Sequence, residues 1–285
     1  MTTREPATNP TVDPELDPSA VLARRELVVA AVVMVALTRT VESADAFLIA
    51  GLLPVVMLAA GVGVLRIGTA GARPFEALLI PAVLTGGAGA AIHLVPIGLG
   101  LVPILAGFAF LLDRILALEL RLLAQATGAT DADRSRVVLA AIVTAFIAFT
   151  GIATLVPGGL AEPGGAATGG APLTEGWLIV LALNDALVAL VLGYRLAVFR
   201  YGTAMDAARS AATFAIIIAI TAGAVRAVDL PLLVGPAVLT LVFYLWDALH
   251  GSGPARRREP HFLWETVLLV VLALVVVAWN LRLRA

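Results

Sequence analysis

The chain has 285 residues, of which 60% are hydrophobic and 14% are charged, and its formal net charge is -1. This apolar share exceeds that of soluble globular domains. The chain contains no cysteine, which excludes disulfides, thiolate metal sites and a cysteine nucleophile. It also contains no lysine, which excludes Schiff-base chemistry and a Walker-type phosphate site. The net charge does not indicate a nucleic-acid partner, and the sequence has no basic strip interleaved with aromatic residues.

The first segment, residues 1–25, is acidic and rich in proline and has little apolar surface to bury. It predicts a disordered cytoplasmic tail. Arg24 and Arg25 directly precede the first apolar run, as expected for a positive-inside anchor. A signal peptide ending at "SADA" (43–46) is the competing interpretation, but the long polar lead-in and the many later apolar runs argue against it.

The remainder of the chain, 26–285, is predicted to be a single transmembrane domain. Apolar runs close to or above the ~18–20 residues needed to cross a bilayer recur along it. We predict an all-α, polytopic transmembrane helix bundle of about nine spans with a cytoplasmic N-terminus, and eight spans if the ninth does not cross. The predicted spans are 26–44, 47–65, 75–95, 98–113, 137–157, 176–195, 209–226, 231–249 and 263–281.

Arginine placement supports this topology. With the N-terminus inside, the cytoplasmic segments hold all of the 19 arginines except Arg39, Arg226, Arg282 and Arg284. Such an asymmetry is typical of multi-pass proteins that obey the positive-inside rule. We therefore expect a multi-pass protein of a bacterial or archaeal plasma membrane, with the lipid bilayer as its first partner.

Three connecting segments carry further signals. In 111–127, Arg114, Arg121 and Gln125 fall on one helical face, which predicts either an interfacial helix or an extension of the fourth span. The pair Asp131-x-Asp133 could bind a metal or a diphosphate, but in front of a helix aspartate is typical of a cap. The Gly/Pro/Ala segment 157–175 predicts a mobile exterior loop.

The sixth predicted span carries Asn184 and Asp185 near its middle. An aspartate at the centre of a bilayer costs about 2.5–3.5 kcal/mol and is a functional hypothesis by default. Small residues recur at helical spacing on this span and on the next, which predicts a closely packed antiparallel pair with Asp185 facing protein. We expect an uncharged carboxyl that acts either in a proton relay or as a static interhelical hydrogen-bond donor. The small residues are Ala182, Ala186, Ala189 and Gly193, then Ala208, Ala212, Ala215, Ala219 and Ala222.

Two other spans combine proline and glycine with a threonine at membrane depth. They are "PAVLTGGAGAAIHLVP" (81–96), with Thr85, and "PLLVGPAVLT" (231–240), with Thr240. Interrupted helices of transporters bind ions and substrates at such places, whereas close helix packing is the ordinary alternative. Asp185, Asn184, Thr85 and Thr240 form our candidate substrate- or proton-binding set.

The three histidines do not indicate a redox or metal site. His93 lies near the outer end of its span, and His250 and His261 flank an arginine-rich inner loop. We expect no haem, no metal and no other cofactor. The segment "YLWDALH" (244–250) predicts an interfacial aromatic anchor, and an acid–base dyad of Asp247 with His250 is the alternative.

Familiar catalytic motifs such as HExxH, GxSxG and paired DxxxD are absent from the sequence. We therefore expect a non-enzymatic accessory or scaffold membrane protein, with other membrane subunits as partners. A small-substrate or proton-coupled transporter with a midplane site around Asp185 is the first alternative, and an intramembrane enzyme is the second.

Overall fold

The structure is a computed structural model that describes residues 18–41, 43–68, 74–124, 130–156, 174–201, 203–227 and 233–251, and also 260, 264, 266–271, 275 and 278. The described residues form helices and no strand. The elements are α1 (Pro18–Thr38), α2 (Ser43–Gly68), α3 (Pro74–Ala77), α4 (Leu79–Ala91), the 3-10 turn η1 (Ile92–Leu94), α5 (Leu101–Ala124), α6 (Asp131–Leu155), α7 (Glu175–Val198), α8 (Ala204–Ala227) and α9 (Val234–Gly251).

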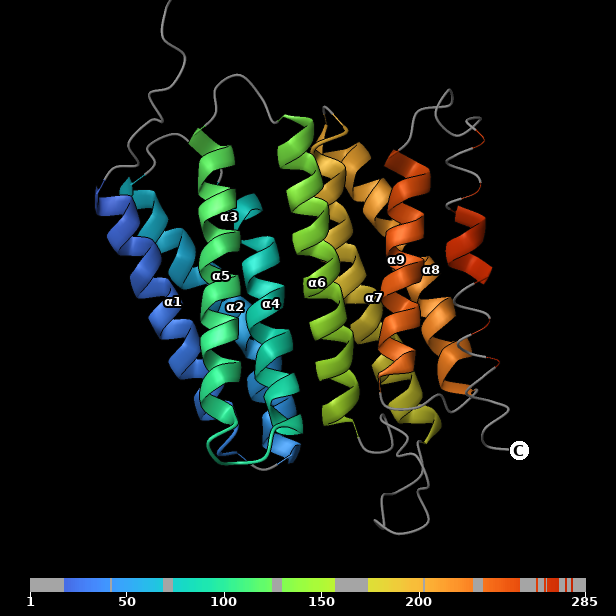
Figure 1. Cartoon of the computed structure of the whole chain (residues 1–285), viewed down its shortest axis with the longest axis horizontal. Coiled ribbons are helices and arrows are strands. Elements are labelled where there is room, and N and C mark those ends of the chain that lie inside the picture. The colour runs from blue at the N-terminus through green and yellow to red at the C-terminus, as the bar shows by residue number, and fades with distance from the viewer. Residues whose placement is uncertain are drawn as a thin grey trace, which may run out of the picture.

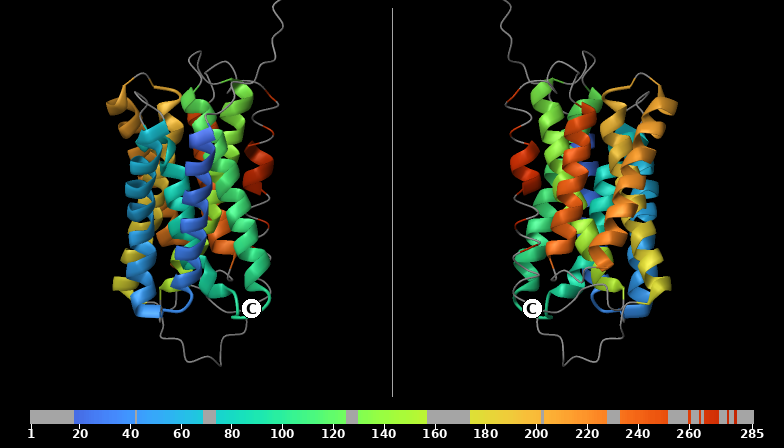
Figure 2. Two further views of the ribbon diagram at one scale, coloured as in Figure 1. Left: turned by 90° about the vertical axis from the view of Figure 1, so that its left-hand side faces the viewer. Right: turned by 90° about the vertical axis from the view of Figure 1, so that its right-hand side faces the viewer.

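The long helices stand side by side and alternate in direction, with α1 at one edge of the bundle and α8 and α9 toward the other (Figure 1). Two side views show that their ends lie at two common levels (Figure 2). The predicted all-α helix bundle is thus confirmed.

Seven of the described helices are long and apolar enough to cross a bilayer, so the chain is a multi-pass membrane protein. Helix α1 is not one of these seven: it has 21 residues but carries the three charged residues Arg24, Arg25 and Glu26. The predicted ninth span, 263–281, lies mostly outside the described residues, and the number of spans therefore stays a prediction.

Two helix boundaries differ from the predicted ones. Helix α1 begins at Pro18, so residues 18–25, which we assigned to the disordered tail, are helical. Helix α5 runs without a break to Ala124, so the segment from 111 onward continues the fourth span. Gln125, residues 1–17 and most of the predicted exterior loop lie outside the described residues.

Helix α4 is the central helix of the bundle. In the apolar window that contains it, 78% of the residues are buried, against 50% or less in each of the other six. Its start follows from Pro81, which lacks an N–H and whose ring clashes with the carbonyl of the residue four positions earlier. That residue is Ala77, where α3 ends before α4 begins at Leu79.

Three glycines let α4 pack closely against its neighbours, two of them at α6 and one at α2. A Cβ atom on Gly151 of α6 would lie 2.3 Å from the Gly87 carbonyl oxygen, and one on Gly87 would lie 2.7 Å from the Ala148 Cα atom. On the other side, a Cβ atom on Gly86 would lie 2.5 Å from Cγ of Pro54 in α2. Because α4 is unbroken across these glycines, close packing explains them and an interrupted helix does not.

Helices α7 and α8 form an extensively packed antiparallel pair, as predicted. The predicted alanine stripe of α8 is correct only at Ala222, since Ala208 is exposed and the other three alanines are half-buried. The buried residues of α8 are Ala207, Ser210, Ala211, Phe214, Ile218, Ala222 and Val225. The Phe214 ring packs onto Gly193 of α7, where a Cβ atom would lie 2.8 Å from its Cγ atom. A large ring on a glycine buries more apolar area than an alanine contact would.

We expect Gly151→Ala to lower the free energy of unfolding by about 1–3 kcal/mol, because the added methyl group forces α4 and α6 apart. Gly63→Ala is the matched control, since a Cβ atom there would meet nothing within 4 Å. Thermal unfolding in detergent, followed by circular dichroism, measures both. Equal midpoints for the two variants would contradict the close α4–α6 contact.

Candidate functional site

Asp185 lies in the middle of α7 and is completely buried. It belongs to the inward stripe Leu181, Asp185, Ala189, Leu192 and Leu196. The side chain therefore faces protein, as its small-residue neighbours predicted.

Asn184 occupies a different face of α7. Its Nδ2 donates to the Val180 carbonyl at 2.8 Å, and its side chain lines a cavity of about 190 Å³ between α2, α4, α6 and α7. Gly86 and Gly87 line the same cavity, and its remaining wall is apolar. Asp185 is not among the described residues that line this cavity, so the two neighbours in sequence have separate surroundings.

Thr85 and Thr240 are both bonded to their own helices. Each ends the sequence "PAVLT", and each hydroxyl donates to the proline carbonyl four residues earlier, Pro81 or Pro236, at 2.8 Å. Each proline is the third residue of its helix, where a missing N–H costs little. The proposed four-residue set is therefore divided, with Asn184 at the cavity and both threonine hydroxyls committed to local bonds.

A buried ion pair between α7 and α5 is a contact that the sequence interpretation missed. Arg195 of α7 forms a bidentate ion pair with Glu119 of α5: Nε donates to Oε1 at 3.1 Å and Nη2 donates to Oε2. The two side chains are 6% and 1% exposed. The Arg195 guanidinium also lies over the Phe199 ring, with Cζ 4.4 Å from the ring centroid, so a carboxylate and an aromatic ring both hold this arginine.

Glu119 was missed because the interpretation of segment 111–127 considered only the helical face that carries Arg114 and Arg121. It lies on the opposite face, at helical spacing from the buried Leu112, Ile115 and Leu116. A single acidic residue in an apolar stripe of a membrane helix is costly unless it is paired. That pattern is the signal that could have found it.

Two further arginines connect the end of α7 to α6 and α9. Arg134 of α6 donates from Nη2 to the Phe199 carbonyl at 2.7 Å, which satisfies one of the carbonyls left open at a helix C-terminus. Arg200 donates from Nη2 to Oδ1 of Asp247 in α9 at 2.5 Å. We call the end of the bundle where α6 begins and α5, α7 and α9 end the arginine-rich end (upper end in Figure 1).

The segment "YLWDALH" ties α9 to its neighbours. Asp247 pairs with Arg200, whereas Nδ1 of His250 lies 3.0 Å from the Trp246 carbonyl. Trp246 donates from Nε1 to the Thr213 hydroxyl of α8 at 3.0 Å. The segment thus contributes an interhelical bond, its role as an interfacial anchor stays a prediction, and the partner of Asp247 shown by the structure is Arg200.

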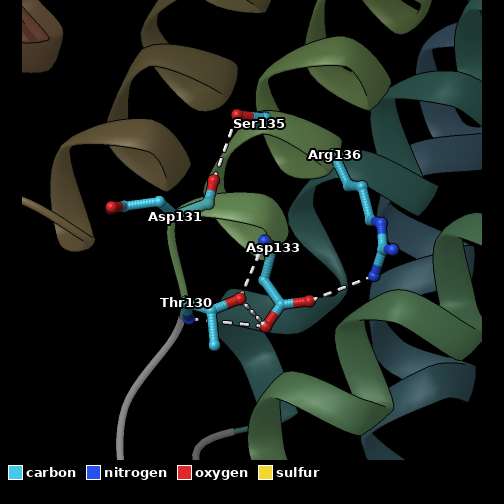
Figure 3. A network of polar contacts seen from close by, with 5 residues as sticks. All are labelled: Thr130, Asp131, Asp133, Ser135 and Arg136. Carbon is cyan, nitrogen blue, oxygen red and sulfur yellow. Dashed lines mark hydrogen bonds and ion pairs between the residues drawn. The ribbon is translucent and has the colours of Figure 1, made fainter.

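Thr130 is the N-cap of α6 and Asp133 completes the cap, which confirms the cap interpretation for Asp133 but not for Asp131. The Thr130 hydroxyl accepts from the Asp133 N–H at 3.2 Å, and the Asp133 carboxylate accepts from the Thr130 N–H at 3.4 Å (Figure 3). This reciprocal arrangement is a capping box. Arg136 pairs with the same carboxylate at 3.3 Å, and no three potential metal ligands cluster anywhere in the described part of the chain.

The fold and these contacts define an all-α, multi-pass membrane protein in which buried charged side chains pair between helices. In the comparisons with known proteins, no family model, no curated protein and no solved structure matches this chain.

We expect Glu119→Leu to lower the free energy of unfolding by about 3–5 kcal/mol, because it leaves the Arg195 guanidinium buried without its carboxylate. The double variant Glu119→Leu/Arg195→Leu should recover most of this loss, since an apolar pair needs no compensation. Denaturant titration in detergent measures both variants.

Asp206→Asn provides the control, because the Asp206–Arg209 pair is exposed and should change the free energy of unfolding by at most about 1 kcal/mol. A double variant as unstable as Glu119→Leu alone would show that the segment needs the charges themselves and not only their pairing.

Proposed function

We propose that the chain is a non-enzymatic accessory or scaffold protein of a bacterial or archaeal plasma membrane, which organises other membrane subunits. The observation that carries this proposal is the pairing of charged side chains across helices, above all Glu119 with Arg195 and Arg200 with Asp247. Buried groups engaged in this way hold helices in place and are not available for proton transfer or nucleophilic attack.

The packing around α4 supports the same role. Backbone contact between α4 and α6 at Gly87 and Gly151 leaves no room for these helices to slide past each other, because close-packed interiors resist continuous deformation. Alternating access requires rocking of one bundle against another. A scaffold needs the opposite property, a fixed surface for its partners.

One observation favours a second candidate, the small-substrate or proton-coupled transporter. The cavity between α2, α4, α6 and α7 brings Asn184 beside Gly86 and Gly87, which joins two of the segments on which the transporter hypothesis was based. Its wall is almost wholly apolar, so it would suit an apolar solute better than an ion. In that case Asp185 would influence the cavity without lining it.

Asp185→Asn separates the two candidates, since it keeps the size of the side chain and removes only its acidity. For a scaffold we expect unchanged yield, unchanged thermal unfolding and unchanged co-purification with partner subunits after cross-linking in native membranes. Asp206→Asn, an exposed substitution in the first turn of α8, is the matched control.

The same proteins are then placed in liposomes under an imposed proton gradient, and uptake of small apolar and polar solutes is measured. No uptake by the wild type is the expected result. Uptake by the wild type that Asp185→Asn abolishes and Asp206→Asn preserves would contradict the scaffold proposal and establish the transporter.

A further inference from the structure

A second cavity, of about 620 Å³, opens at the arginine-rich end between α6, α7 and α9. We call it the interfacial cavity. Along α6 its wall is polar at the helix start, with Arg134 and Ser135, and apolar one to two turns deeper, with Val138, Leu139 and Ile142. A cavity that is polar at the level of the helix ends and apolar toward the bilayer interior matches the two parts of a phospholipid.

The polar part presents two guanidinium groups. Arg134 and Arg200 both line the cavity and are held close to each other, because Arg134 bonds to the carbonyl of Phe199, the residue that precedes Arg200. Arg200 donates to Asp247 from Nη2, while its buried Nη1 has no hydrogen-bond partner among the described residues. Guanidinium forks of this kind match phosphate oxygens.

The position of Arg200 is fixed by its surroundings. A Cβ atom on Gly251 would lie 2.7 Å from Nη2 and 2.9 Å from Cζ of Arg200. The last residue of α9 therefore leaves space for the guanidinium, and Asp247 holds it there. A binding group that is oriented before its ligand arrives loses less entropy on binding.

The same wall also carries a carboxylate. Asp131 lines the interfacial cavity, and its side chain points away from the cluster of Thr130, Asp133 and Arg136 (Figure 3). With Asp247 it balances the charges of the two arginines. A purely anionic headgroup would leave Asp131 facing negative charge, whereas a headgroup with both a phosphate and an ammonium group satisfies every charge on the wall.

We propose that the interfacial cavity binds a zwitterionic aminophospholipid, with its phosphate on Arg134 and Arg200, its ammonium group on Asp131, and an acyl chain along Val138, Leu139 and Ile142. This site is independent of the scaffold role. It gives the bundle a fixed lipid at the junction of α6, α7 and α9.

The test uses the purified full chain in nanodiscs, with native mass spectrometry to count retained lipids from equal mixtures of phosphatidylethanolamine, phosphatidylglycerol and phosphatidylcholine. We expect preferential retention of phosphatidylethanolamine. Arg134→Gln should reduce it about fivefold, the usual effect of one interfacial arginine. Asp131→Asn should abolish the preference over phosphatidylglycerol.

Arg136→Gln is the matched control, because it removes the same charge from the same helix while its side chain pairs with Asp133 and does not line the cavity. It should leave lipid retention unchanged. If Arg134→Gln does not fold, Arg134→Lys keeps the charge with a single donor group and should still reduce retention.

Three results would overturn the proposal. They are equal retention of the three lipids by the wild type, equal losses in Arg134→Gln and Arg136→Gln, and displacement of the lipid by free phosphoethanolamine or inorganic phosphate at matched concentration. The last result would assign the site to a soluble phosphate compound.

Discussion

The C-terminal end of α7 is connected to three other helices through three arginines. Arg195 reaches Glu119 of α5, the Phe199 carbonyl receives Arg134 of α6, and Arg200 reaches Asp247 of α9. Buried charged groups in membrane helices are costly unless they are paired, so these contacts restrict how the helices can be arranged. The positions of α5, α6 and α9 around α7 follow from them at this end of the bundle.

The middle of the bundle depends on the opposite kind of contact, one without charge. Gly86, Gly87 and Gly151 remove side chains where α2, α4 and α6 meet, and dispersion between closely packed backbones replaces the hydrophobic effect that is missing inside a bilayer. Glycine contact at the centre and ion pairs at one end therefore stabilise the same helices by different means. A rigid bundle of this kind suits the proposed scaffold role.

The arginines at the arginine-rich end have different structural roles, which their number and position in the sequence do not show. Arginine clusters on the cytoplasmic side of membrane proteins are usually explained by the positive-inside rule, which treats them as equivalent. In this structure they differ: Arg195 is buried in an ion pair, Arg136 serves a helix cap, and Arg134 and Arg200 line a cavity. Among these four described arginines, Arg134 and Arg200 are the two to which we assign a ligand.

The amino-acid sequence by itself determined the helical class, most of the span positions, the cap at Asp133 and the burial of Asp185, because each of these follows from local hydropathy, spacing or chain chemistry. The tertiary structure alone decided which residues meet across long separations. Glu119 and Arg195 are 76 residues apart, and hydropathy does not encode which helices become neighbours. It also decided that Thr85 and Thr240 bond to their own helices and that Phe214, not an alanine, fills the contact at Gly193, because side-chain volume and hydrogen-bond direction are settled only when the helices pack.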